Sequence, residues 1–191
     1  GQLLVRRERA PEGARGFGRR PRARLELVPY EPGADERWLW HHLEAQTRSL
    51  TRGALSGGWP PGLLCEFVLR RWESGPEALH ATLTEMVTFH VRWLEAAAHG
   101  RQLDRLSARA LFGGGDLQEV LPFMLPDHGA PSSADVSDAR QDLATLRALR
   151  ARARAVLGDC GRDRALRELA DQLDPDERLL VFTSYVDAAR G

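Results

Sequence analysis

Apolar runs near the two ends of the chain have the pattern of β-strands. Leu179 to Phe182 is a continuous apolar run after a charged turn, which predicts a buried strand, most simply a parallel one. Residues 23–30 alternate between apolar and polar side chains, as a half-exposed strand does, and Pro29 ends that strand or places it at an edge. Another short apolar run, Leu3-Leu4-Val5, lies near the N-terminus.

The region between these ends has apolar residues at helical spacing, which predicts five or six helices. They are expected at about residues 35–50, 63–72, 76–99, 103–111, 133–157 and 164–173. Asp35 is the expected cap of the first helix. Ser74 or Gly75 precedes Pro76, a residue that suits a first helical turn.

The last two predicted helices follow a polar loop. Ser132, Ser133 or Ser137 is expected to cap the long helix, and Gly158 to end it. The shorter helix that follows should turn its apolar residues inward, namely Leu166, Leu169, Ala170 and Leu173.

These elements predict a mainly α fold, an irregular helical bundle or protrusion with short flanking β segments. A single buried parallel strand needs neighbours on both edges and cover on both faces. We therefore expect the chain to be a segment of a larger protein.

The basic residues are unevenly distributed along the sequence. The net charge is zero, and all 27 basic residues are arginine. Arginines crowd the first 24 residues and also residues 147–167. The guanidinium group suits phosphate, and basic clusters are typical of nucleic-acid binding. A solvated basic surface that balances acidic neighbours is the alternative interpretation.

Candidate chemistry within the chain is sparse. Cys65 and Cys160 lie in no motif and are expected to pack as small hydrophobic residues rather than form a bridge. His80 and His90 lack partners at metal spacing and are expected at the surface or the edge of the core. The glycine triplet at 113–115 lacks the Lys-Ser/Thr of a phosphate loop. No apolar run approaches the roughly 20 residues that span a bilayer.

Several segments, in order, resemble the Swi/Snf-type ATPases of helicase superfamily 2. Residues 182–189, Phe-Thr-Ser-Tyr-Val-Asp-Ala-Ala, after Asp-Arg-Ala-Leu at 163–166, resemble helicase motif IV. Arg164 stands where lysine is usual and Ala188 where threonine is common. Residues 4–9 resemble the end of the first lobe, and residues 19–32 the stretch that leads into the helical protrusion. Residues 69–79 are similar to a segment of bacterial members, including those like the RNA-polymerase-recycling ATPase.

The resemblance implies a division of the chain into three parts. Residues 1–30 would be the tail of a first RecA-like lobe and a linker, 31–158 a helical insertion, and 159–191 the start of a second RecA-like lobe. The flanking β segments would then belong to incomplete α/β lobes.

The resemblance also implies a function. The parent protein would use ATP and Mg²⁺ to move along double-stranded DNA or RNA. The phosphate loop and the Asp-Glu-x-His motif that this chemistry requires are not in this sequence, so we expect no catalytic residue, cofactor or metal site here. The expected nucleic-acid contacts are Thr183, Ser184, Tyr185, Arg6, Arg7, Arg19 and Arg20.

A protein of another class is the alternative. The chain would then be a self-contained α-helical module that binds a protein partner or regulates an enzyme. If the chain is instead part of a Swi/Snf-type ATPase, we expect a cytoplasmic, nucleoid-associated bacterial protein, with a further protein partner on the helical insertion and no membrane contact.

Overall fold

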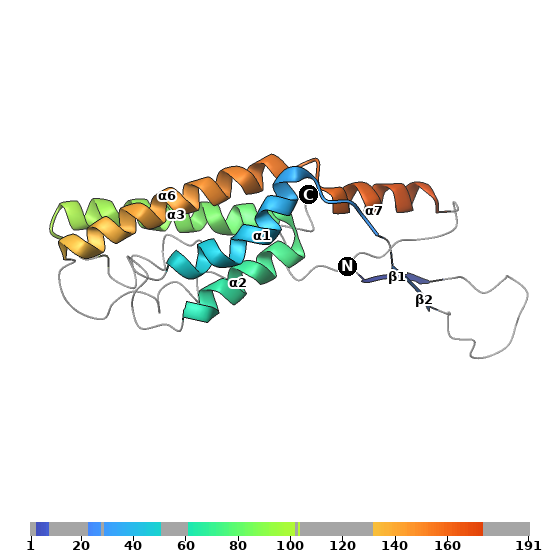
Figure 1. The fold of residues 1–191 in the computed structure, drawn as a ribbon, viewed down its shortest axis with the longest axis horizontal. Helices are drawn as coiled ribbons and strands as arrows, with labels where there is room; N and C mark the ends of the chain where they lie inside the picture. The colour runs from blue at the N-terminus through green and yellow to red at the C-terminus, as the bar shows by residue number, and fades with distance from the viewer. Residues whose placement is uncertain are drawn as a thin grey trace, which may run out of the picture.

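The computed structural model describes residues 3–7, 23–27, 29–50, 61–101, 103 and 132–173. This part of the chain is mainly α-helical, as the sequence predicts. Helices α1 (Ala34–Ser49), α2 (Pro61–Ser74), α3 (Pro76–Ala98) and α6 (Ser133–Val156) form a bundle (Figure 1). Contacts join α1 to α2, α2 to α3, α3 to α6 and α6 to α1, so the four helices close a ring.

Successive helices of this ring run in opposite directions, as the colour order in Figure 1 shows. An even number of antiparallel helices returns the chain to the end of the bundle at which it started. The start of α1 and the end of α6 therefore lie at the same end.

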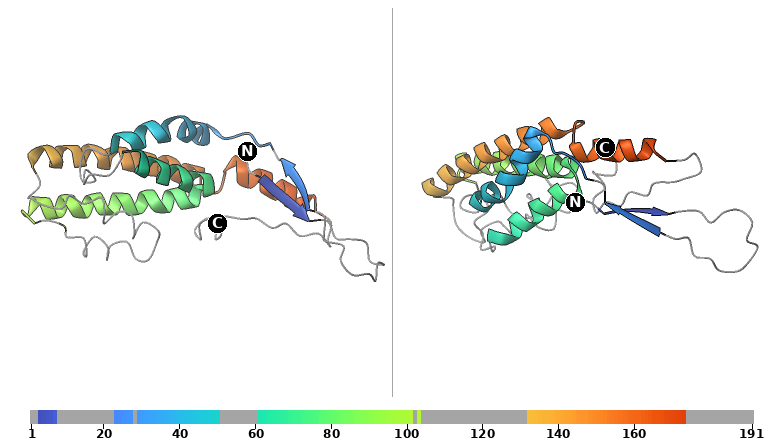
Figure 2. Two further views of the ribbon diagram at one scale, coloured as in Figure 1. Left: turned by 90° about the horizontal axis from the view of Figure 1, so that it is seen from below. Right: turned by 45° about the vertical axis from the view of Figure 1, so that its right-hand side comes forward.

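Three further elements lie beyond that end of the bundle (Figure 2). Helix α7 (Gly161–Asp171) follows α6 after a short turn. Strands β1 (Leu3–Arg7) and β2 (Ala23–Leu27) pair antiparallel, with Leu3 opposite Leu27. Strand β2 lies within residues 23–30, and β1 includes the apolar run at residues 3–5. The predicted strand at 179–185 and the predicted helix at 103–111 lie outside the described residues, apart from Leu103.

The core of the bundle consists of large apolar side chains that recur every three or four residues. This spacing places them on one face of each helix. The fully buried side chains include Leu39 and Leu43 of α1, Leu64 of α2, Leu79, Leu83, Met86 and Phe89 of α3, and Leu146 of α6. Burial of each such side chain stabilises the fold by about 1.5–3 kcal/mol.

The helix ends confirm most of the predicted caps. Gly75 precedes α3, and Pro76 occupies its first turn. At the start of α6 the Ser132 hydroxyl accepts a hydrogen bond from the Asp135 amide at 3.2 Å, and the Asp135 carboxylate accepts one from the Ser132 amide at 2.8 Å. This reciprocal pair is a capping box. Gly158 follows α6 with φ of 83°, a backbone conformation that favours glycine.

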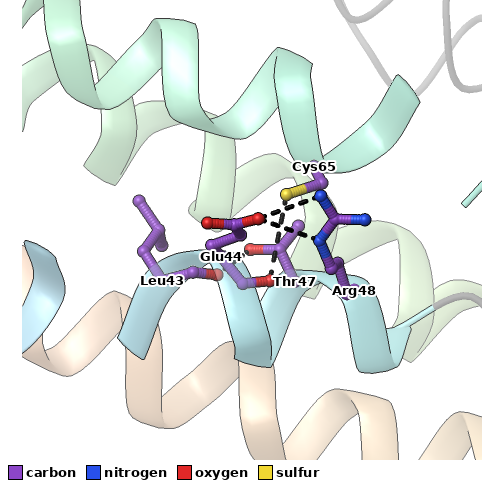
Figure 3. A network of polar contacts seen from close by, with 5 residues as sticks. All are labelled: Leu43, Glu44, Thr47, Arg48 and Cys65. Atoms are coloured by element: carbon purple, nitrogen blue, oxygen red, sulfur yellow. Dashed lines mark hydrogen bonds and ion pairs between the residues drawn. The ribbon is translucent and has the colours of Figure 1, made fainter. Parts of the chain in front are cut away.

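The contact between α1 and α2 includes a buried cysteine (Figure 3). Cys65 donates its S–H to the carbonyl of Glu44 at 3.8 Å, and the hydroxyl of Thr47 donates to the carbonyl of Leu43 at 2.6 Å. Arg48 binds the Glu44 carboxylate on the exposed side at 2.9 Å. Both cysteines of the chain are free and buried, which confirms their predicted role.

Two predictions about the bundle helices are wrong. The cap of α1 is Gly33 rather than Asp35, because Glu36, three residues into the helix, binds the Gly33 amide. His90 is fully buried rather than at the edge of the core. Its Nδ1–H donates to the Met86 carbonyl at 2.8 Å, which satisfies one ring nitrogen inside the core.

The prediction for α7 is wrong in a different way. The helix begins at Gly161 rather than Arg164, and Gly161 is its one buried residue. Leu166, Leu169 and Leu173 are half-buried, and Ala170 is exposed. The reason is the position of α7 beyond the end of the bundle, where the four packed helices do not cover it (Figure 1).

Candidate functional site

The described residues do not test the nucleic-acid contacts predicted from the sequence. Arg6 and Arg7 lie on β1, whose backbone alone is described. The other five predicted contacts lie outside the described residues: Arg19, Arg20, Thr183, Ser184 and Tyr185. The site that the structure does define is the end of the bundle where α1 begins and α6 ends.

Glu36 holds this end of the bundle together. Its carboxylate accepts hydrogen bonds from the amide of Gly33 at 2.8 Å, the amide of Gly161 at 2.8 Å and the thiol of Cys160 at 2.9 Å. Glu36 itself is only 3% exposed. It lies in the first turn of α1 and also faces the first turn of α7, and helix N-termini favour a negative charge. One carboxylate therefore caps two helices that lie 125 residues apart in the chain.

Gly161 marks how closely the two segments approach. A Cβ atom at this position would overlap the carbonyl oxygen of Glu31 and lie 3.1 Å from the Tyr30 ring. The segment that leads into α1 therefore lies directly against the segment that leaves α6. The chain enters and leaves the four-helix bundle at one point.

A hollow of about 300 Å³ opens beside this junction. Its lining residues come from α1, α2, the start of α7 and the segment before α1: Tyr30, Glu36, Trp40, Trp72, Glu73, Cys160 and Arg162. Trp40 is 65% exposed, the one large hydrophobic side chain so exposed in the described part of the chain. Arg162 donates to the carbonyl of Glu73 at 3.0 Å and so ties α7 to the end of α2.

The polar groups of the hollow are poor candidates for catalysis. Burial raises the pKa of the Cys160 thiol to about 12, and the hydrogen bond to Glu36 acts in the same direction. The thiolate is the reactive form of cysteine, so this thiol is inert near neutral pH. The carboxylate of Glu36 is occupied by three donors. The arrangement stabilises a junction rather than activating a nucleophile.

Histidines and acidic residues form no metal centre in the described residues. No group of three or more metal-binding side chains gathers within the ranges given above. The Nδ1–H of His42 donates to the Trp38 carbonyl at 2.8 Å, and the His42 ring stacks on the Trp38 ring with their centroids 4.5 Å apart. His80 is half-buried, as predicted for a residue at the edge of the core.

The arginines of residues 147–167 differ in whether they have partners. Several of these arginines do. Arg152 pairs with Asp35 and lies 5.1 Å from the Trp38 ring centre. Arg164 lies 3.8 Å from Asp159. Arg147, Arg150 and Arg154 form no ion pair with another described residue and lie along α6.

Sequence reasoning did not find the Glu36 junction. A local signal was present, because Glu36 stands three residues after Gly33, the spacing at which an acidic side chain binds the amide of a cap residue. The link to Cys160 has no such signal, since it depends on how four helices return the chain to its starting point.

No helix among the described residues is both long and apolar enough to cross a membrane. Comparison with protein-family models, with curated proteins and with solved structures found no match to this chain.

Proposed function

We propose that residues 31–158 are a helical insertion between two lobes of a Swi/Snf-type ATP-dependent nucleic-acid translocase. One observation carries this proposal: the chain enters and leaves the bundle at one point, where Glu36 binds both segments. A domain inserted between two parts of an enzyme needs neighbouring ends, because the parts on either side must still lie together.

The flanking elements are consistent with this arrangement. Strands β1 and β2 precede the bundle and helix α7 follows it, and all three lie beyond the junction end (Figure 2). The half-buried leucines of α7 are suited to pack against further structure of the second lobe. The assignment of these flanking elements to RecA-like lobes rests on the resemblance described above.

The proposed role of this segment is to bind nucleic acid, and not to hydrolyse ATP. ATP and Mg²⁺ would be held by motifs of the parent protein that this sequence does not contain. The proposed partner is duplex DNA or RNA. Thr183, Ser184 and Tyr185 remain candidate phosphate contacts, with Arg6, Arg7, Arg19 and Arg20. The proposal places the parent protein in the bacterial cytoplasm at the nucleoid.

Duplex binding by this chain tests the proposal. Fluorescence anisotropy with labelled DNA and RNA duplexes, each titrated over a series of NaCl concentrations, gives the affinity and its salt dependence. We expect binding that weakens steeply with salt, because phosphate contacts release counterions. A folded chain that binds neither duplex at the lowest salt would contradict the proposal.

A self-contained helical interaction module is the second candidate. The exposed Trp40 beside the hollow favours it, because exposed tryptophans are frequent at protein interfaces. For such a module we expect a folded protein that does not bind duplex. Its binding to a protein partner should be lost on Trp40→Ala substitution.

A further inference from the structure

Three arginines form a row along the C-terminal half of α6. Arg147, Arg150 and Arg154 are separated by three and four residues, which places them within about 60° of one another around the helix. Arg147 and Arg154 are exposed and Arg150 is half-buried. We call these three residues the α6 arginine row.

The charge of this row is not balanced within its own helix. Residues 143–158 contain no acidic side chain, whereas the first part of α6 carries Asp135, Asp138 and Asp142. Elsewhere on the bundle, three exposed arginines, Arg48, Arg70 and Arg92, are paired along their own helices. Arg48 binds Glu44 at 2.9 Å, and Arg70 binds Glu66 at 2.5 Å.

The neighbouring helix adds no acidic partner to the row. Helix α3 packs against α6 (Figure 1), and its described acidic residues form no ion pair with the row. His80 of α3 lies near two of the three arginines. The pKa of His80 is lowered, first by burial and then by the positive charges of Arg150 and Arg154. Two guanidinium groups thus lie close enough to His80 to repel its protonated form.

We propose that the α6 arginine row binds the phosphate backbone of a nucleic-acid duplex, which deepens the function proposed above and rests on it. Arg147 and Arg154 are seven residues apart, or about 10 Å along the helix axis. Over this length a duplex carries about six phosphate charges. Guanidinium groups bind phosphate in a bidentate manner, and contacts to phosphate carry no direct base specificity.

The exposed alanines beside the row favour a nucleic acid over a lipid surface. Four alanines of α6 are exposed: Ala144, Ala148, Ala151 and Ala155. A helix that lies in a membrane interface presents large apolar or aromatic side chains beside its basic residues. Alanines offer little apolar area to a bilayer, but they allow close approach of a phosphate backbone.

The test compares two triple variants of the 191-residue chain. R147Q/R150Q/R154Q removes the row, and R48Q/R70Q/R92Q removes the same number of charges from the ion pairs with Glu44, Glu66 and Glu95. Glutamine retains helix propensity close to that of arginine. Circular dichroism establishes that each variant is folded. Duplex affinity is then measured by anisotropy over a series of NaCl concentrations.

We expect the row variant to bind at least about tenfold more weakly at low salt than the control variant. The slope of log affinity against log salt should become less steep by about 2.7, since each phosphate contact contributes about 0.9. Equal losses in the two variants would overturn the inference and leave the proposed function standing. No duplex binding by the unsubstituted chain would overturn both. Row-dependent binding to vesicles of anionic phospholipid, with no duplex binding, would also contradict the inference.

Discussion

Replacing His90 with leucine should change the pH dependence of stability. His90 is fully buried in α3, and its Nδ1–H donates to the carbonyl of Met86 at 2.8 Å. Its Nε2 has no hydrogen-bond partner among the described residues. A proton on Nε2 would place a positive charge in the core. Burial therefore lowers the pKa of His90 to about 4, and the bond to Met86 opposes this shift only in part.

The magnitude follows from the difference between the folded and unfolded states. The unfolded chain takes up the proton near pH 6.5, and the folded chain does so only near 4. The stability contributed by neutral His90 is fully present above pH 6.5 and is lost as the pH falls toward 4. A difference of 2.5 pKa units corresponds to about 3 kcal/mol in total, of which about 2 kcal/mol is lost by pH 5.

Urea unfolding of the wild type and His90→Leu between pH 7 and pH 4.5 measures this effect. Leucine has no proton to bind, so the variant should gain about 2 kcal/mol relative to the wild type between pH 7 and pH 5. His99→Leu is the matched control, because His99 makes the same bond to the carbonyl four residues earlier, at 2.7 Å, in an exposed position. Wild type and His90→Leu stabilities that change in parallel over this range would show that burial does not lower the pKa of His90.

Three further predictions concern the junction and are each measurable by urea unfolding or by mass spectrometry. Glu36→Gln should lower the free energy of unfolding by about 3 kcal/mol, because three donors lose a buried charged acceptor. Glu44→Gln, at an exposed ion pair, should lower the free energy of unfolding by about 0.5 kcal/mol or less. Equal losses from the two substitutions would contradict the role of Glu36. Gly161→Ala should destabilise the fold by about 1–3 kcal/mol, because the new Cβ would overlap the carbonyl oxygen of Glu31. Gly62→Ala should not, since no atom lies within 4 Å of a Cβ at that position. Cys160 should resist iodoacetamide at pH 8 until urea unfolds the chain, and rapid native labelling would disprove its burial.

Local chemistry accounts for the part of the fold that was predictable. The Ser132 and Asp135 side chains, Pro76 at the start of α3 and Gly158 after α6 each act within a few residues, so their pattern is visible in the sequence. Apolar spacing likewise located the buried faces of α1, α2, α3 and α6.

Features that depend on tertiary structure were not predictable in the same way. The contact between Glu36 and Cys160 spans 124 residues and exists only because the helices close a ring. His90 shares the apolar face of α3, yet its residue type suggested the surface. The half-exposed leucines of α7 depend on what lies beyond the bundle. The contacts expected from Thr183 to Tyr185 lie outside the described residues and remain predictions.

The coding sequence on both sides of this segment distinguishes a helical insertion from an independent helical module. For an insertion, we expect a Gly-x-Gly-Lys-Ser/Thr loop and an Asp-Glu-x-His motif upstream in the same reading frame, and an arginine-rich motif downstream of Gly191. Together they would make the four-helix bundle an insertion between two ATPase lobes. A reading frame that contains none of these motifs would contradict the account, and the helical interaction module would then be the better explanation.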